Sequence, residues 1–391
     1  MKRGTTDYSL VVGIDKPRGM TSHDVVNRVR RIFGERRVGH TGTLDPLAEG
    51  VLPVCVGPAT RLGAYLTGHD KRYRVRIAFG VATETDDSEG TILRRGDIPR
   101  EIEDPGFAEL FVSTLVGKRK QLPPVYSAVK VDGKKSYEAA RKGNVIDLTP
   151  RDIEVFEARL IGMGRGYPLP GSGRDAAAAA PGAVLADPAA MDPAADPAAT
   201  ADPAAAQQAD PGSVRGEGAG PWCDLPWWDV EFHVSKGTYI RSLARDAGNA
   251  LGCPAHVCAL KRTRSGLLDL EDCVTLETLE EVRERAALDP IRLLGLRFAY
   301  ADGPLSAAVA NGAALRADEV ELFVRRRAGA LAEMCACTAG VVRSCEPVSD
   351  GESIAVISEN KLAALYEYDG GKRLWRARCV FQKGVLRGSC I

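Results

Sequence analysis

One carboxylate stands out in residues 39–52, which read Gly-His-Thr-Gly-Thr-Leu-Asp-Pro-Leu-Ala-Glu-Gly-Val-Leu. Asp45 lies among glycine, threonine and proline residues, and a strand-like run follows at Val51. Glycine lets a loop take unusual backbone angles and lets a ligand come close, while Pro46 restricts the backbone of Asp45 before it. The pattern therefore indicates a loop that holds one carboxylate in one pose. Spacing alone leaves two interpretations open, a catalytic carboxylate or an ordinary Asp-Pro turn.

The length and composition limit the class of protein. The chain has 391 residues, enough for two or three domains, and its 45% hydrophobic and 27% charged content is typical of a soluble globular protein. The basic N-terminus lacks the apolar core of a signal peptide, and no apolar run reaches membrane-spanning length. Ten scattered cysteines without a CxxC pair indicate reduced thiols. The sequence predicts a cytoplasmic protein with no membrane attachment.

The net charge of zero hides an uneven distribution of charge. Residues 164–226 carry three arginines against seven aspartates and one glutamate, a net charge of −5, so the remainder carries +5. Basic residues also cluster in four runs, at residues 28–31, 36–37, 71–76 and 118–120. A single run is usually a solvated face, but several runs around the Asp45 loop favour a polyanionic substrate.

Signatures of cofactor and metal chemistry are missing from the sequence. It contains no GxGxxG dinucleotide loop, no P-loop and no HExxH motif. Cys253, His256 and Cys258 are close in sequence but lack the spacing of a structural zinc site, and His256 fits a packed strand better. A fixed carboxylate can still perform demanding chemistry through covalent catalysis. The sequence predicts a protein that uses no cofactor and no metal.

Periodic patterns predict the elements that position the loop. Apolar residues recur at helical spacing over residues 22–33, after a capping threonine and before Gly34, which ends the helix. Residues 59–66 fit a short helix. Residues 72–79 alternate as a half-buried strand, with Tyr73 on the apolar face and arginines on the other face, where they could hold phosphates.

The second half of the chain shows further strands and one clear helix. Residues 153–161 and 229–234 alternate as strands, residues 237–251 fit a turn and a helix, and residues 256–266 fit a strand and a turn. After about residue 294 the pattern weakens to a helix or two and short strands, at 353–357, 363–368 and 374–381. A small β-rich appended domain fits this region best.

The composition changes abruptly from about residue 165 to residue 220, which are rich in Ala, Pro, Asp and Gly. The unit Asp-Pro-Ala-Ala recurs, so that a proline breaks any helix every four or five residues. Few large apolar side chains are present to form a core. The sequence therefore predicts disorder here.

The Asp45 loop resembles the catalytic motif of the TruB family of tRNA pseudouridine synthases, Gly-His-x-Gly-Thr-Leu-Asp-Pro-x-Ala-x-Gly-Val-Leu. The resemblance covers roughly residues 10–160 and 225–275, and it does not include the acidic insertion. Three further matches carry it: Lys16-Pro17, the run Gly-Thr-Tyr-Ile-Arg that ends at Arg241, and the pair Leu260 and Arg262.

The resemblance implies a role for each matching residue. Asp45 would be the nucleophile, Arg241 would form an ion pair that keeps Asp45 ionised and oriented, and Tyr73 would stack on a flipped uracil and take part in proton transfer. His40 would fill the gap left by that base, and Leu260 would pack beneath the catalytic residues. The other implied substrate-binding residues are Tyr239, Arg262 and Lys130. Judged without the family, Tyr73 fits a core residue equally well, and His40 fits a hydrogen-bonded loop residue.

The implied fold is α+β, a pseudouridine synthase fold with a mixed, largely antiparallel sheet core and a small β-rich PUA-like C-terminal domain. The catalytic domain would comprise residues 1–163 and 222–293, with an RNA-gripping insertion at about 121–151. Residues 164–221 would be the disordered insertion, and residues 294–391 the C-terminal domain.

The implied function is isomerisation of uridine to pseudouridine in the T-loop of tRNA, at position 55. Its partner would be the T-arm of tRNA, with no obligate protein partner. Two alternatives stay open: a guide-RNA-dependent pseudouridine synthase of the same fold, and a non-catalytic RNA-binding or RNA-folding module.

Overall fold

A mixed β-sheet that carries the Asp45 loop forms the centre of the structure. The computed structural model describes residues 6–126, 130–131, 134–135, 148–167, 225–325 and 341–388. Its central strands are β1 (Leu10–Lys16), β2 (Val38–His40), β3 (Ala48–Val56), β4 (Lys71–Phe79), β7 (Gly117–Gln121), β10 (Arg151–Tyr167), β11 (Leu225–Val234), β12 (Ala255–Ser265) and β13 (Leu268–Asp269).

Within these described residues, the strands join in the order β1-β3-β12-β4-β11-β10-β7, while β2 pairs with β3 and β13 pairs with β12. The β12–β3 pair is parallel, and the other pairs of this sheet are antiparallel. The sheet is therefore mixed and largely antiparallel, as the sequence predicts. Two short hairpins accompany it, β5 (Val81–Thr83) with β6 (Ile92–Arg95), and β8 (Lys130–Val131) with β9 (Lys134–Lys135).

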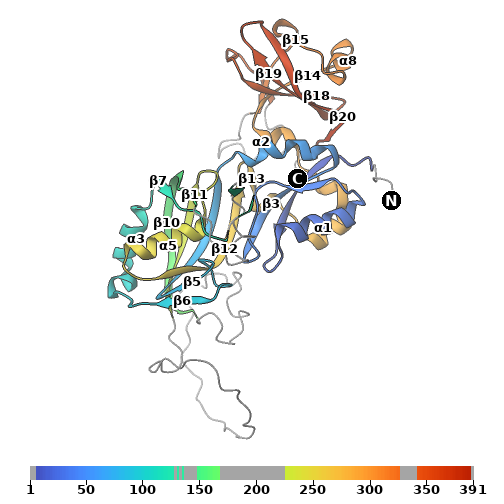
Figure 1. Ribbon diagram of the computed structural model, residues 1–391. Coiled ribbons are helices and arrows are strands. Elements are labelled where there is room, and N and C mark those ends of the chain that lie inside the picture. Colours follow the sequence, from blue (N-terminus) through green and yellow to red (C-terminus); the bar gives the residue numbers. More distant parts are fainter. Residues whose placement is uncertain are drawn as a thin grey trace, which may run out of the picture.

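Helices pack on this sheet and bury its apolar face (Figure 1). The helix with the clearest sequence signal, α1, spans Ser22–Phe33, where the Thr21 side chain caps the N-terminus and Gly34 ends the helix at φ 64°. The other α-helices are α2 (Gly63–Thr67), α3 (Pro105–Ser113), α5 (Ile240–Ala250), α6 (Leu276–Val282), α7 (Pro290–Leu294) and α8 (Pro304–Ala310). The 3₁₀ turns are η1 (Gly57–Leu62), η2 (Arg100–Glu103), η4 (Leu270–Asp272), η5 (Arg283–Ala286) and η6 (Ala317–Glu319).

Two of the expected elements differ in detail from the structure. The short helix expected at 59–66 is η1 followed by α2, because Pro58 begins a tighter turn before the α-helical hydrogen bonds start. The strand expected at 153–161 is longer, so residues 164–167 belong to β10 and not to the acidic insertion. Residues 168–224, which hold the rest of that insertion, lie outside the described residues.

A second sheet stands above α2 in Figure 1 and contains the C-terminal strands. Its order in the described residues is β15-β20-β19-β18-β14-β16-β17. The three strands expected near the C-terminus correspond to β18, β19 and β20. The bounds are β14 (Arg297–Tyr300), β15 (Leu315–Arg316), β16 (Phe323–Arg325), β17 (Val341–Arg343), β18 (Ser353–Ser358), β19 (Lys361–Asp369) and β20 (Leu374–Leu386).

The two sheets share part of one hydrophobic core. Val51 and Cys55 of β3 cluster with Phe298, Leu365 and Phe381 of the C-terminal sheet, and all of these side chains are buried. Leu386 also donates a backbone hydrogen bond of 2.7 Å to the Ser9 carbonyl before β1. The C-terminal sheet is thus packed directly against the strand that follows the Asp45 loop.

Among the described residues, no helix is both long enough and apolar enough to cross a membrane.

Candidate active site

The Asp45 loop is held at both ends by hydrogen bonds. Ser22, the first residue of α1, accepts a hydrogen bond from the Leu44 amide and donates one to the Leu44 carbonyl, each 2.8 Å long. The Asp45 carbonyl accepts from the Ala48 amide at 3.1 Å as β3 begins. The Asp45 side chain is still 40% exposed. The loop therefore fixes the backbone while it presents the carboxylate at the surface.

Arg262 of β12 supports the loop from behind. Its Nε donates to the Val51 carbonyl at 2.7 Å, and its Nη2 donates to the Gly42 carbonyl at 3.0 Å. The side chain is only 1% exposed. At Gly50 (φ 95°), a Cβ would lie 2.2 Å from the Arg262 carbonyl, so only glycine fits. Arg262 therefore holds the loop, and the substrate contact implied by the sequence stays a prediction.

Lys16, from the Lys-Pro motif, is a second buried cation behind the loop. Its Nζ donates to the carbonyls of Pro17 at 2.8 Å, Met20 at 2.6 Å and Pro46 at 3.5 Å. Burial lowers the pKa of Lys16 to about 8, although nearby carboxylates including Asp45 oppose the shift. Lys16 thus ties the start of the chain to the residue that follows Asp45.

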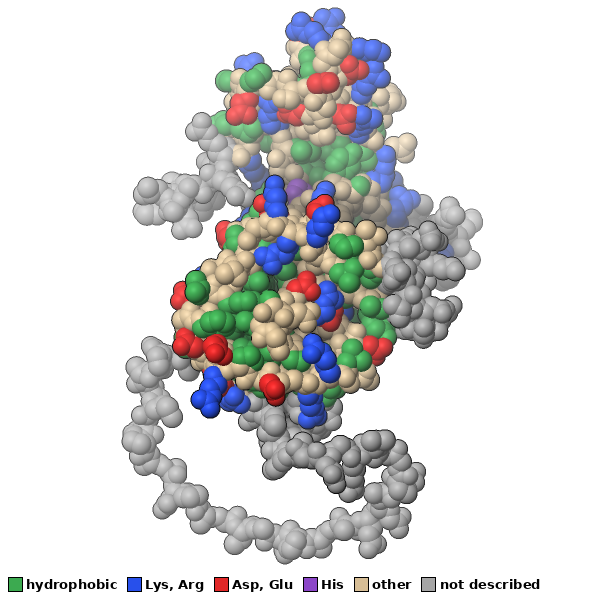
Figure 2. Space-filling view, turned by 60° about the vertical axis from the view of Figure 1, so that its left-hand side comes forward, with side chains coloured by type: hydrophobic (Ala, Val, Ile, Leu, Met, Phe, Trp, Pro, Cys, Tyr) green, Lys and Arg blue, Asp and Glu red, His purple; other side chains and the backbone are tan. Residues whose placement is uncertain are grey.

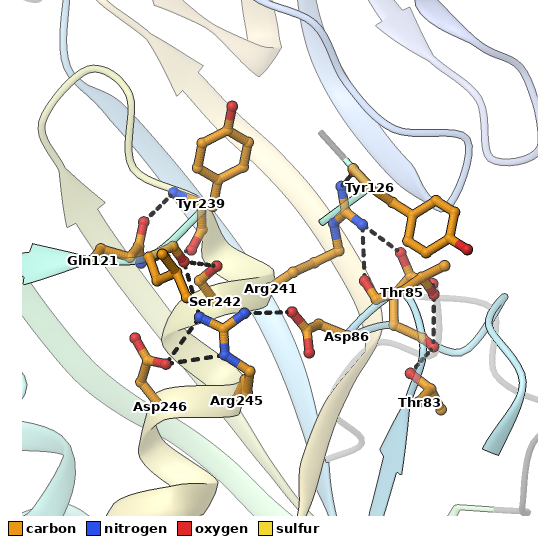
Figure 3. A network of polar contacts seen from close by, with 12 residues as sticks. Thr83, Thr85, Asp86, Gln121, Tyr126, Tyr239, Arg241, Ser242, Arg245 and Asp246 are labelled. Carbon is orange, nitrogen blue, oxygen red and sulfur yellow. Dashed lines mark hydrogen bonds and ion pairs between the residues drawn. The ribbon is translucent and has the colours of Figure 1, made fainter. Parts of the chain in front are cut away.

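Arg241 contacts Asp45, and Figure 3 shows how the same guanidinium reaches Thr85 and Tyr126. Its Nη2 lies 2.8 Å from Asp45 Oδ2, so the expected ion pair is present, and its Nη1 lies 3.4 Å from Asp87 Oδ2. Nη1 and Nη2 also donate to the carbonyls of Thr85 at 2.8 Å and Tyr126 at 3.1 Å. Arg241 is 5% exposed. Four oxygen partners therefore fix a buried guanidinium against one exposed carboxylate.

Asp87 is the site residue that the sequence analysis missed. It is 3% exposed, accepts from the Glu89 amide at 3.0 Å, and also accepts from the Thr85 hydroxyl. The run Thr-Glu-Thr-Asp-Asp-Ser-Glu-Gly at residues 83–90 contains it. Such an acidic turn is ordinarily solvated, and only its position beside Arg241 distinguishes Asp87 from its neighbours.

Tyr73 and Leu260 lie on adjacent central strands. Tyr73 of β4 is opposite Arg262 of β12, and Leu260 of β12 is opposite Val75 of β4 and pairs in parallel with Ala48. Tyr73 and Leu260 are each 8% exposed. No hydrogen-bond partner of the Tyr73 hydroxyl is found in the part of the chain that the structure describes. Both side chains thus lie in the sheet region that supports the loop.

The arginines beside Tyr73 lie on the opposite face of the sheet. Arg72 pairs with Glu157 at 3.1 Å, Arg74 pairs with Glu231 at 3.3 Å, and Arg76 makes two contacts of 2.7 Å with a β11 aspartate. The expectation that these arginines hold phosphates stays a prediction. Acidic residues of the neighbouring strands β10 and β11 already neutralise them.

Three other residues are predicted to bind the substrate. His40 is at the end of β2, and its Nδ1 is buried with no hydrogen-bond partner among the described residues; burial, and then the charge of Arg262, lower its pKa. Tyr239 precedes α5, where its amide donates to Gln121 Oε1 at 2.9 Å. Lys130 begins β8, and its side chain lies outside what the structure describes.

Basic side chains are exposed in the last turn of α1 and in the connection that follows it. Arg31, Arg36 and Arg37 are exposed, and within the described residues none of them forms an ion pair. Figure 2 shows Lys and Arg side chains scattered over the face of the molecule that it presents, with acidic side chains among them. The free arginines nearest to His40 in sequence are thus those of the α1–β2 connection.

No set of three potential metal ligands gathers anywhere in the described ranges. His256 is fully buried in β12, with its Nδ1 3.0 Å from the Val81 carbonyl. Its assignment to a packed strand is confirmed.

Comparisons with known proteins agree with this arrangement. The family model "TruB family pseudouridylate synthase (N terminal domain)" matches residues 30–167, and "tRNA pseudouridylate synthase B C-terminal domain" matches residues 241–293. A tRNA pseudouridine synthase B of Deinococcus radiodurans is 40% identical over 281 residues, which cover 72% of this chain and 82% of that protein. One from Listeria welshimeri is 32% identical over 374 residues, which cover 95% and 98%.

A solved structure described as an H/ACA RNP bound to a substrate RNA containing 2′-deoxyuridine shares the fold. The TM-score is 0.51 at 20% identity, and the match covers 96% of this chain and 85% of that chain. Together with the sheet topology, the comparisons confirm the expected α+β pseudouridine synthase fold. The PUA-like character of the C-terminal sheet stays a prediction.

Proposed function

The chain belongs to the TruB family and is a tRNA pseudouridine synthase; we propose that its target is uridine 55 in the T-loop and that Asp45 is the nucleophile. The observation that carries the proposal is the contact between Asp45 and Arg241. A buried arginine holds a carboxylate that is 40% exposed, which is the arrangement needed to present an oriented anion to a substrate.

The proposed chemistry needs no added group. The N-glycosidic bond of the target uridine breaks, the uracil turns over in the site, and C5 bonds to C1′ in place of nitrogen, with loss of the C5 proton. Asp45 either attacks C1′ or assists loss of a sugar proton. Arg241 keeps the carboxylate in place in both routes, because Asp87, Thr85 and Tyr126 leave the guanidinium no freedom to turn away.

A stacked base cannot reach Asp45, so the target must leave the RNA stack. We assign Tyr73 to stacking on the extruded uracil, since its ring lies on the strand next to Arg262 and no described residue engages its hydroxyl. We assign His40 to the gap left in the RNA. Burial lowers the pKa of His40, so the ring is neutral at pH 7 and can lie beside bases without the cost of burying a charge.

The polyanionic partner is proposed to be the T-arm of tRNA. Arg31, Arg36 and Arg37 are suited to phosphate contacts because they are exposed and free of ion pairs in the described chain. Lys130 and the neighbouring lysines of the 121–151 segment are the other proposed contacts. A cytoplasmic location, expected for a tRNA-modifying enzyme, stays a prediction.

The stand-alone enzyme is preferred over the two alternatives. The solved structures of ribonucleoprotein complexes are at most 22% identical to this chain, so that likeness carries only the fold. The curated relatives at up to 40% identity are named tRNA pseudouridine synthase B. A non-catalytic module has no need for an arginine that is buried against the exposed Asp45.

The test is to incubate purified protein with a bare T-arm hairpin labelled with tritium at C5 of uridine. Tritium release and mapping of pseudouridine to position 55, without any guide RNA, are the expected result. A hairpin with cytidine at that position is the matched control and should release nothing. Product that appears only with a guide RNA, or at another uridine, would refute the proposed target.

A further inference from the structure

Helix α5 carries a second arginine one turn after Arg241, and this residue touches three parts of the protein (Figure 3). Arg245 Nη1 lies 2.8 Å from Asp86 Oδ2, and Nη2 donates to the Leu122 carbonyl at 2.9 Å. Nε and Nη2 both contact Asp246 Oδ1 at 3.1 Å. The side chain is 25% exposed. All three guanidinium nitrogens of Arg245 therefore have hydrogen-bond partners, and Asp45 is not one of those found in the described residues.

The first connection from Arg245 to the active site runs through two consecutive carboxylates. Asp86 pairs with Arg245, and the next residue, Asp87, pairs with Arg241. Asp86 has a φ of 60°, which is uncommon for a residue other than glycine. Such a conformation persists where surrounding contacts hold it. The Arg245 contact thus fixes the turn that also presents Asp87 to Arg241.

The second connection runs through the segment that leads into the basic insertion. The Leu122 carbonyl accepts from Arg245 and from the Ser242 hydroxyl, both at 2.9 Å. Four residues later, the Tyr126 carbonyl accepts from Arg241 Nη2, the nitrogen that also binds Asp45. Residues 123 and 124 between them are both proline, which fixes their φ angles. A stiff connection therefore joins the two carbonyls.

We propose that Arg245, together with Asp86, is a positioning residue that aims Arg241 at Asp45. Arg245 holds Asp86, which precedes Asp87 in the turn, and the Leu122 carbonyl, which two prolines join to Tyr126. Helix α5 sets the spacing between the two arginines. This inference rests on the proposed role of Asp45. A positioning role and a purely structural role predict different results. If Arg245 positions Arg241, its loss slows the reaction after RNA is bound, whereas loss of a purely structural ion pair lowers only the stability of the fold.

The experiment compares Arg245→Met with Arg76→Met in the full chain. Arg76 is the matched control because it also makes two contacts with one aspartate and is 30% exposed, but it lies on the opposite face of the sheet. The measurements are the single-turnover rate at saturating tRNA, the Kd for tRNA, and the melting temperature. Arg245→Met should lower the rate about ten- to a hundredfold, since small misplacements of catalytic groups have effects of this size. Its Kd should stay within about threefold of wild type.

A second readout follows the structure directly. Hydrogen exchange of the backbone amides of residues 121, 122, 125 and 126 should speed up in Arg245→Met and not in Arg76→Met, since the two prolines between them carry no amide hydrogen. Arg245→Lys keeps a charge for Asp86 but loses the fork that also reaches Leu122, so its rate should fall between those of wild type and Arg245→Met. If Arg245→Met fails to fold, the rate of Arg245→Lys decides the question.

The proposal is overturned if the rate of folded Arg245→Met is within twofold of wild type, or falls no more than that of Arg76→Met. All rates are expressed relative to wild type on the uridine that wild type modifies. A wild-type enzyme that acts at a different uridine would therefore refute the proposed target but leave this comparison intact.

Discussion

Replacement of Asp87 by asparagine separates the charge of that residue from its positioning role. Arg241 contacts two carboxylates, Asp45 at 2.8 Å and Asp87 at 3.4 Å, and Asp87 is 3% exposed. Asparagine keeps the size and one acceptor oxygen, but it removes the negative charge. The amide nitrogen can also turn toward Arg241, which allows the guanidinium to shift away from its present orientation.

The stability cost should be moderate. Breaking a buried ion pair outright costs about 3–5 kcal/mol because one charge stays uncompensated. Here Arg241 keeps Asp45 and two carbonyl acceptors, so the loss is closer to that of one charge-assisted hydrogen bond, about 1.5–3 kcal/mol. At roughly 2–4 °C per kcal/mol, the melting temperature of Asp87→Asn should fall by several degrees. The protein should remain folded at 25 °C.

The catalytic effect should be larger than the stability effect. Removal of a negative charge near Asp45 does not by itself harm an anionic nucleophile, because like charges repel. A role through charge alone therefore predicts an unchanged or faster reaction, whereas positioning predicts a slower one. We expect the single-turnover rate on a T-arm hairpin to fall about a hundredfold, with the Kd for RNA nearly unchanged. A rate equal to that of wild type in folded Asp87→Asn would refute the reasoning.

Three further predictions test other parts of the site. Tyr73→Leu should weaken capture of the flipped base by about ten- to a hundredfold, since base–aromatic stacking contributes roughly 1–3 kcal/mol. Tyr73→Phe should retain the stacking contribution because it keeps the ring. A wild-type kcat for Tyr73→Leu would mean that Tyr73 is a core residue. Arg74→Ala should leave KM for tRNA and its salt dependence within about twofold of wild type, because Arg74 lies on the face of the sheet opposite Tyr73. Its exposed ion pair with Glu231 contributes little to stability. A large rise in KM would show that RNA binds on that face. His40→Gln should reduce the loss of stability that wild type shows as the pH falls below 6.5. Burial lowers the pKa of His40, so below that pH the unfolded chain binds a proton at this residue that the folded chain does not. Melting temperatures that fall equally in wild type and His40→Gln between pH 7 and pH 5.5 would contradict this.

Local signals allowed much of the fold to be predicted from the sequence. The limits of α1 follow from a capping threonine and a terminal glycine, and β4 follows from strict alternation around Tyr73. The Asp45 loop was identified by its glycine and proline content together with the family motif. These features depend on residues close in sequence, so no knowledge of the tertiary structure was required.

Contacts between distant residues explain what the sequence could not predict. The partner of Arg74 is Glu231, which is 157 residues away, and a run of arginines by itself does not reveal such a neighbour. Burial of Arg262 is also a property of the tertiary structure, because its guanidinium is enclosed by strands that are distant in sequence. Asp87 was missed because an acidic turn gains meaning only when Arg241 lies beside it.

The most direct test of the central claim is the reaction of Asp45→Asn on tRNA. The amide preserves the size of the side chain but cannot act as the nucleophile, so no pseudouridine above background should form in a single-turnover assay. Binding of tRNA should stay within about threefold of wild type, because the phosphate contacts are elsewhere. Intact-mass analysis must first show that the asparagine has not deamidated. Substantial pseudouridine formation by the pure variant would contradict the assignment of Asp45.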